Sequence, residues 1–419
     1  MNSNLLLLSF LFITVVFLSS AQIVERTPPE YIRTIEFKGN TAGQSKLPIL
    51  RLGEPLYLSF DVLNGDESDF YYKITHCDFN WTPSNLAKNE YLDGYDEIRL
   101  YNYENSLNTL QIYSHYMLAI PNNDTRAITK SGNYVLTILD DDGNEVFSRK
   151  FMVVENLVGV PVAIKRSRDL RYIEEKQVVQ FTVESYDTPL INPKQTVHTL
   201  IMQNNNLKTA ITNLKPQYTI GHKLIYRYDQ EASFWGGNEF LNFDNKDIRA
   251  GANGIRRVEL TDIYNNYLYT HSPRKDRPYT YFPDINGNFV IRNIDGRDSR
   301  IEADYVRMHF TLQYFDDLDD KEIHIYGNFN NWTIDATTYL KYDEASDTYK
   351  LARLFKQGFY NYRYVLVNKD GTIDQGAIGG NFWQTENDYT VLVYYREQGG
   401  RYDRIIGMGT ANSSVINNN

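Results

Sequence analysis

The chain has 419 residues and a formal net charge of −10 at pH 7. This length predicts two to four domains with conventional hydrophobic cores. The acidic balance offers no clustered Lys and Arg face of the kind that nucleic-acid binding requires, so no nucleic-acid partner is expected. Aromatic residues make up 14% of the chain, with 34 Tyr and 21 Phe, and Tyr, Phe, Val and Ile favour pleated strands. We therefore expect an all-β protein.

The N-terminus has the pattern of a secretory signal peptide. An apolar run, LLLLSFLFITVVFL at residues 5–18, precedes the small residues Ser19-Ser20-Ala21. We expect residues 1–21 to be removed as a signal peptide and the exported chain to begin at Gln22. An uncleaved N-terminal anchor is the alternative. The run is too short to span a bilayer comfortably, and no later stretch is long and apolar enough, so no direct membrane insertion is expected.

Short strand patterns follow along the rest of the chain. Alternation of apolar and polar residues is typical of half-buried strands, and it is clearest at residues 55–63, 133–154, 176–185 and 321–329. The pattern starts afresh after residue 157 and again near residue 300. We therefore expect tandem immunoglobulin-like or early-set β-sandwiches: an N-terminal domain at 22–157, a middle β-rich domain at 158–300, a C-terminal early-set-like domain at 301–413, and a disordered tail at 414–419.

No recognisable catalytic signature accompanies these patterns. The seven histidines are not paired at zinc-ligand spacing, and the chain has no nucleophile elbow, Walker-type loop or dinucleotide-binding loop. Its only cysteine, Cys77, excludes an intramolecular disulfide and is expected to be a small buried hydrophobe. We expect no enzyme activity, no catalytic residue, no cofactor and no metal. A carboxylate pair for glycoside hydrolysis stays open, because 53 acidic residues allow many pairings.

Two phrases in the C-terminal part resemble the glycogen-binding modules of starch-handling enzymes. They are HIYGNFNNWTID at residues 324–335 and GFYNYRYVLVNKDGT at 358–372. In that family an aromatic residue of the turn and a basic residue of the later strand hold the sugar. The resemblance implies a vestigial glycan platform made of Trp332, Tyr362 and Arg363.

The same region departs from the glycogen-binding pattern at one position. The family places a second aromatic residue just after an Asp-Gly turn, whereas Asp370-Gly371 is followed here by Thr372 and Ile373. Half of the stacking surface is therefore missing, and glycan binding is not expected. Instead, Trp332 is expected to pack the turn of a sandwich whose role is structural.

A longer resemblance covers nearly all of the exported chain. Residues 74–123, 131–143 and 393–413 are similar to the plug proteins of the type IX secretion system of the Bacteroidetes. The resemblance implies a periplasmic, non-enzymatic subunit at the inner face of the outer membrane. Its partner would be the SprA-type outer-membrane barrel, whose periplasmic opening it would seal when no substrate is in transit. The alternative is an α-glucan-binding module protein or a glycan-active enzyme.

Overall fold

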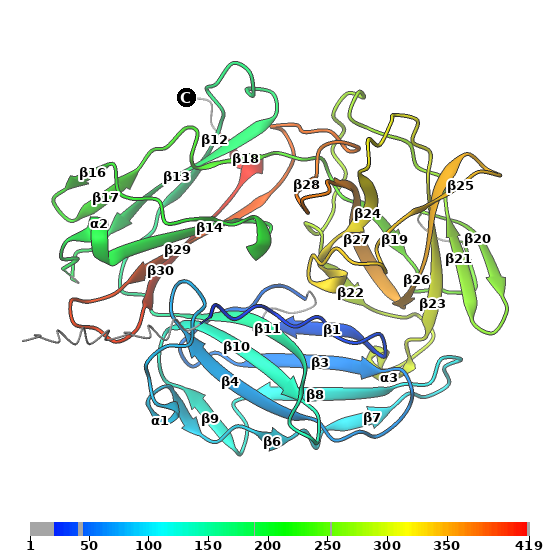
Figure 1. The fold of residues 1–419 in the computed structure, drawn as a ribbon, viewed down its shortest axis with the longest axis horizontal. Helices are drawn as coiled ribbons and strands as arrows, with labels where there is room; N and C mark the ends of the chain where they lie inside the picture. Colours follow the sequence, from blue (N-terminus) through cyan, green and yellow to red (C-terminus); the bar gives the residue numbers. More distant parts are fainter. Residues whose placement is uncertain (1–20, 41–44, 188, 252–253, 417–419) are drawn as a thin grey trace, which may run out of the picture.

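The computed structural model describes residues 21–40, 45–187, 189–251 and 254–416. This part of the chain is nearly all β and forms three sandwiches (Figure 1), which confirms the expected fold class. The expected signal peptide lies outside the described residues except for Ala21. Within the described ranges, no helix combines the length and the apolar character that crossing a membrane requires.

The first sandwich is built from residues 32–154. Its four-stranded sheet has the order β1 (Ile32–Lys38), β3 (Leu56–Val62), β8 (Ser114–Ile120), β7 (Tyr103–Asn105). Its five-stranded sheet has the order β2 (Ile49–Arg51), β11 (Glu145–Val154), β10 (Gly132–Leu139), β4 (Tyr71–Cys77), β6 (Ile98–Arg99). The short helix α1 (Lys88–Tyr91) leads into a small ribbon of β5 (Leu92–Gly94) and β9 (Thr125–Ile128).

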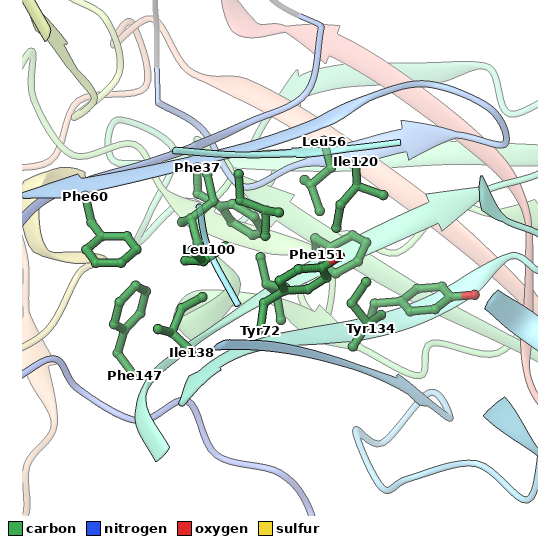
Figure 2. Packing of buried hydrophobic residues seen from close by; sticks show 14 of the residues in the cluster. Phe37, Leu56, Phe60, Tyr72, Leu100, Ile120, Tyr134, Ile138, Phe147 and Phe151 are labelled. Carbon is green, nitrogen blue, oxygen red and sulfur yellow. The ribbon is translucent and has the colours of Figure 1, made fainter. Parts of the chain in front are cut away.

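Aromatic side chains fill the space between these two sheets (Figure 2). The Phe60 ring stacks on Tyr116 with the centroids 5.3 Å apart, and it meets Phe147 edge-on at 5.2 Å. Offset and edge-to-face contacts of this kind add to the free energy gained by burying the rings. The high Tyr and Phe content is thus used here as core volume.

The second sandwich takes strands from two distant parts of the chain. One sheet has the order β12 (Val162–Arg166), β13 (Lys176–Glu184), β17 (Lys223–Tyr226), β16 (Tyr218–Ile220), with β18 (Ser233–Trp235) also paired to β13. The other has the order β15 (Ile211–Thr212), β14 (Val197–Gln203), β29 (Asp388–Tyr395), β30 (Arg404–Asn412). Short helical turns are α2 (Pro193–Thr196), η1 (Leu207–Thr209) and η3 (Ser413–Val415).

The third sandwich is inserted between β18 and β29. One sheet centres on β27 (Gly358–Val367), which pairs with β19 (Leu241–Asp244), β22 (Phe289–Ile291), β24 (Glu322–Tyr326) and β28 (Ile373–Asp374). The other has the order β20 (Ile255–Leu260), β21 (Tyr264–Leu268), β23 (Tyr305–Leu312), β26 (Thr348–Lys356), β25 (Lys341–Asp343). The helical turns are α3 (Ser299–Glu302) and η2 (Asn328–Asn330).

This nesting differs from the expected ranges 158–300 and 301–413. Strand β14 lies in the first range and β29 in the second, yet they pair along seven residues from Val197 to Gln203. Strands β21 and β23 also pair across the expected join near residue 300. Alternation identifies a strand but not the strand it pairs with. The sequence therefore contains no local pattern that shows the chain returning to the second sandwich at β29. Of the expected tail, residues 414–416 are described, and Ser414 and Val415 belong to η3.

The second sandwich docks on the outer face of the five-stranded sheet of the first. Val135, Met152 and Val154 on that face pack against Leu392 and Tyr394. Seven of the eight residues of β10 are buried, whereas the alternation at 133–154 predicted one exposed face. A sheet covered on both faces needs no polar face, which explains the difference.

The third sandwich contacts both of the others. Asn206 Nδ2, in the second sandwich, donates to the hydroxyl of Tyr326 at 2.8 Å. In the first sandwich, the carbonyl oxygen of Ser45 accepts a hydrogen bond from Asn328 Nδ2 at 2.8 Å. Each sandwich therefore touches the other two, and the three close into one block (Figure 1).

We predict that Tyr394→Phe destabilises the joint between the first and second sandwiches. The Tyr394 hydroxyl is fully buried and donates to Asn133 Oδ1 at 2.8 Å, so its removal leaves a buried acceptor unpaired. The expected loss is about 1–3 kcal/mol of unfolding free energy, measured by denaturant titration. Tyr342→Phe is the matched control, because the Tyr342 side chain is half-exposed and its hydroxyl donates to Asp347 at the surface. Equal effects in the two variants would contradict this role.

Candidate functional site

Trp332, the aromatic residue of the predicted glycan platform, is buried. It keeps 4% of its surface exposed and packs against Tyr326 and Phe240, with ring centroids 5.0 and 6.0 Å away. Ile373, which stands where the family has its second aromatic residue, packs against the same cluster. Trp332 therefore acts as a core side chain of the third sandwich and presents no open face to a sugar.

The other two platform residues are buried as well, and they do not share one face. The guanidinium carbon of Arg363 lies 3.7 Å from the centroid of the Phe240 ring, in the cluster that contains Trp332. Tyr362 precedes Arg363 on β27, so it points to the opposite side of the sheet and packs among residues such as Phe310. The structure brings Arg363 and Trp332 together but separates Tyr362 from both.

The described residues offer no metal site. No group of three or more His, Cys, Asp or Glu side chains in these ranges is arranged to hold an ion. Cys77 is fully buried, and burial raises the pKa of its thiol to about 12. A thiol that stays protonated at neutral pH is a poor nucleophile.

The most distinctive polar cluster lies at the seam between the first and third sandwiches. Asp61 on β3 is fully buried, and Lys356 on β26 places its Nζ atom 2.7 Å from Asp61 Oδ2. The Tyr305 hydroxyl donates to the same oxygen at 2.7 Å. His115 Nδ1 lies 2.6 Å from Oδ1, and because an ionised carboxylate only accepts, this nitrogen carries the proton.

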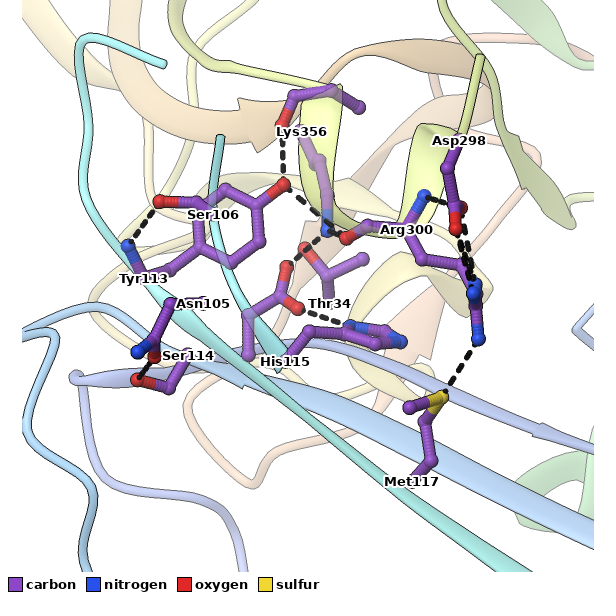
Figure 3. A network of polar contacts seen from close by, with 12 residues as sticks. Thr34, Asn105, Ser106, Tyr113, Ser114, His115, Met117, Asp298, Arg300 and Lys356 are labelled. Carbon is purple, nitrogen blue, oxygen red and sulfur yellow. Dashed lines mark hydrogen bonds and ion pairs between the residues drawn. The ribbon is translucent and has the colours of Figure 1, made fainter. Parts of the chain in front are cut away.

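A second set of bonds surrounds the ion pair (Figure 3). Lys356 Nζ also donates to the carbonyl oxygen of Arg300 at 2.6 Å and lies 4.1 Å from the centroid of the Tyr113 ring. The Tyr113 hydroxyl donates to the carbonyl oxygen of Ala303 at 2.8 Å. Polar groups of the first sandwich therefore depend in part on partners in the third, and the reverse.

The charges at the seam determine its pH dependence. Burial raises the pKa of Asp61, but Lys356 and the hydrogen bond from His115 outweigh burial and hold it below its usual range. A carboxyl group whose pKa is lower in the folded state stabilises the fold above its ordinary pKa. This contribution is present at neutral pH and is lost as acid protonates Asp61.

Sequence patterns did not indicate this cluster. Leu58, Phe60 and Val62 point into the first core, so alternation along β3 places Asp61 on the opposite, outer face. An aspartate on the outer face of a sandwich is expected to be solvated. It is buried because the third sandwich covers it, and no local signal carries that information.

We predict that Lys356→Met weakens the seam strongly. Removing one partner of a buried ion pair leaves the other charge uncompensated, which costs about 3–5 kcal/mol of unfolding free energy. Denaturant titration at neutral pH measures the loss. The double variant Asp61→Asn/Lys356→Met should recover a large part of it.

The matched control is Lys350→Met on the same strand. Lys350 pairs with Asp343 at the surface with 47% of its side chain exposed, and exposed pairs contribute less than about 1 kcal/mol. A loss at Lys356 no greater than at Lys350 would refute the role given to the buried pair.

A protein-family model matches the residues of the first sandwich as one domain. The model of the type 9 secretion system plug protein 1st domain matches residues 32–155, which span β1 to the end of β11. No curated protein matches the chain.

Solved structures extend the comparison to the rest of the chain. A crystal structure of a hypothetical protein from Parabacteroides merdae ATCC 43184 is 30% identical with a TM-score of 0.88, and the match covers 94% of this chain and 100% of that one. The BSP domain of a biofilm associated protein is 8% identical with a TM-score of 0.18 over 94% of this chain and 61% of that one, so it bears on neither fold nor function. By the match of its first sandwich, the chain belongs to the type IX secretion system plug protein family.

Proposed function

We propose that this protein is the periplasmic plug of the type IX translocon. It would lie at the inner face of the outer membrane and seat against the periplasmic opening of the SprA-type barrel, sealing it when no substrate is in transit. The observation that carries this proposal is the plug-family match over residues 32–155. The role is non-catalytic, so it requires a shaped surface and no active site.

The build of the molecule supports a sealing role. A cover must keep its shape against a wide opening, and here all three pairs of sandwiches are joined. The first and second sandwiches share an apolar cluster. The first and third are joined by the buried Asp61–Lys356 ion pair. A hydrogen bond from Asn206 to Tyr326 joins the second and third. Relative domain motion is the default where interfaces are small and polar, and these joints oppose it.

A plug must also be released. Reversible association fits an interface of about 1,200–2,000 Å² with a polar rim, and a large apolar obligate interface does not. Exposed aromatic residues suit such a surface because they give contact area with few rotatable bonds. Tyr95 and Tyr101, which are 74% and 70% exposed on the first sandwich, are side chains of this kind.

The alternative glycan-binding role has less support. Trp332, Tyr362 and Arg363 are each 9% exposed or less. A sugar platform requires an aromatic face open to solvent, and none of these rings provides one. We therefore retain one proposed function.

Deleting the gene should make the outer membrane leaky while leaving the cell alive. An uncovered protein-conducting barrel admits solutes that ordinary porins exclude, so sensitivity to large antibiotics should increase. Growth inhibition and uptake of a large fluorescent dye measure the leak. Secretion should fall only modestly, because a cover does not drive transport.

The control is a double deletion that also removes the SprA-type barrel. It should restore resistance, since no opening remains to be sealed. A single mutant as impermeable as its parent would rule out sealing. A leak that persists without the barrel would have another origin and would also count against the proposal.

A further inference from the structure

A cleft of about 100 Å³ lies where the first and third sandwiches meet the N-terminal segment. Its walls come from residues 25–30, from β1 and β11, and from the turn 328–331 of the third sandwich. Five basic residues line it against three acidic ones. The basic residues are Arg33, Lys46, Arg149, Lys150 and Arg353, and the acidic ones are Glu25, Glu30 and Asp335.

The three arginines have unused hydrogen-bonding capacity. None of Arg33, Arg149 and Arg353 forms an ion pair with a carboxylate in the described part of the chain. Only 8% of Arg149 is exposed, and its Nη1 donates to the carbonyl oxygen of Ser148 at 2.8 Å. Arg353 donates to Thr337, and Arg33 Nε is buried with no partner. A guanidinium has five N–H donors, so most of them remain available.

Two of the acidic side chains already accept hydrogen bonds from other residues that line the cleft. Glu25 accepts the backbone N–H of Lys150 at 2.8 Å with one oxygen and Asn331 Nδ2 at 3.0 Å with the other. Asp335 accepts the backbone N–H and the hydroxyl of Thr337. These bonds hold the N-terminal segment and the turn in place, and they leave the guanidinium groups without a counter-charge in contact.

The backbone is strained on both sides of the cleft. The register of β1 with β3 shifts between Arg33 and Glu36, and Thr34 in this bulge has φ 48°. Asn331 and Trp332 in the opposite turn each have φ 57°. Bulges re-aim side chains next to functional sites, and non-glycine residues in left-handed conformations persist only where their surroundings hold them.

Burial disfavours the charges of two arginines in the cleft, and Arg33 also repels Arg353. Burial lowers the pKa of Arg149. Burial and the nearby charge of Arg33 lower the pKa of Arg353 to about 10. An anion between these groups would relieve both effects, because it supplies opposite charge where water is scarce.

We infer that this cleft binds a phosphate group, either free or as a small phosphate monoester. Each guanidinium group can donate two parallel hydrogen bonds to a pair of phosphate oxygens. Three guanidinium groups carry three positive charges, which a phosphate group balances better than the single negative charge of a carboxylate. The bound group would link β1 and β11 of the first sandwich to β26 of the third. It would therefore act as a small-molecule clamp on the seam, a role separate from sealing.

The test is thermal unfolding of the exported chain, residues 22–419, in a phosphate-free buffer. Sodium phosphate should raise the melting temperature saturably by several degrees, whereas sodium chloride at equal ionic strength should not. Titration calorimetry with inorganic phosphate and with glycerol 3-phosphate measures binding directly. Binding of inorganic phosphate alone would assign the free ion, and comparable binding of glycerol 3-phosphate would assign the monoester.

Variants locate the effect in the cleft. Arg353→Gln should melt at or above the parent temperature without phosphate, because it removes the repulsion from Arg33. Both Arg353→Gln and Arg149→Gln should lose the phosphate response. Arg33→Gln, which is only partly buried, gives a third variant whose loss of binding can be measured even if the other two fold poorly. Arg126→Gln is the matched control, since that arginine is 65% exposed and paired with Asp93 at the surface.

Three outcomes would overturn the inference. The first is an equal response to chloride and phosphate. The second is a phosphate response that survives in the Arg33, Arg149 and Arg353 variants. The third is a response to succinate as large as that to phosphate with the same dependence on Arg149, which would show a carboxylate site.

Discussion

The five-stranded sheet of the first sandwich carries apolar side chains on both faces, and the assembly of the molecule depends on covering the outer one. Val135, Met152 and Val154 would face water if the second sandwich were absent, and burying each such side chain is worth roughly 1.5–3 kcal/mol. The third sandwich is inserted in the chain of the second. When the second sandwich docks on the first, the third is therefore brought next to the first as well. That placement brings Lys356 to Asp61 and allows a buried charge pair whose partners come from different sandwiches.

The apolar joint and the ionic seam contribute in different ways. Burial of apolar area is non-directional and holds the sandwiches together. A buried ion pair adds little net stability but penalises any arrangement that separates its partners. Together they favour a single geometry of the block. A cover over a wide channel requires that property, and the proposed sealing role makes use of it.

Sequence reasoning reached the parts of this structure that local patterns encode. Alternation, Tyr and Phe content and the lack of long helical periodicity led to the all-β fold, and long ordered motifs led to the family. The pairing of β14 with β29 was beyond reach, because nearly two hundred residues separate Val197 from Tyr395. The burial of Asp61 was hard to predict for a similar reason, since neighbouring parts of the chain do not say which outer face another sandwich covers.

The glycan resemblance illustrates a related limit. The sequence of the turn at Gly327–Trp332 resembles the glycogen-binding modules, and Asn331 and Trp332 in it both have positive φ. In this chain the tryptophan packs on one face of the paired strands β24 and β27, and the residues before it line the arginine cleft. A resemblance in a short motif therefore does not bring a sugar site with it.

Affinity purification of the tagged chain from solubilised outer membranes is the most direct measurement of the proposed role. If the chain covers the translocon, a very large outer-membrane barrel protein should be recovered with it in near-equimolar amount. The same preparation should pass through an α-glucan column without retention. Absence of the barrel together with retention on the glucan would contradict the plug assignment and favour a sugar-binding function.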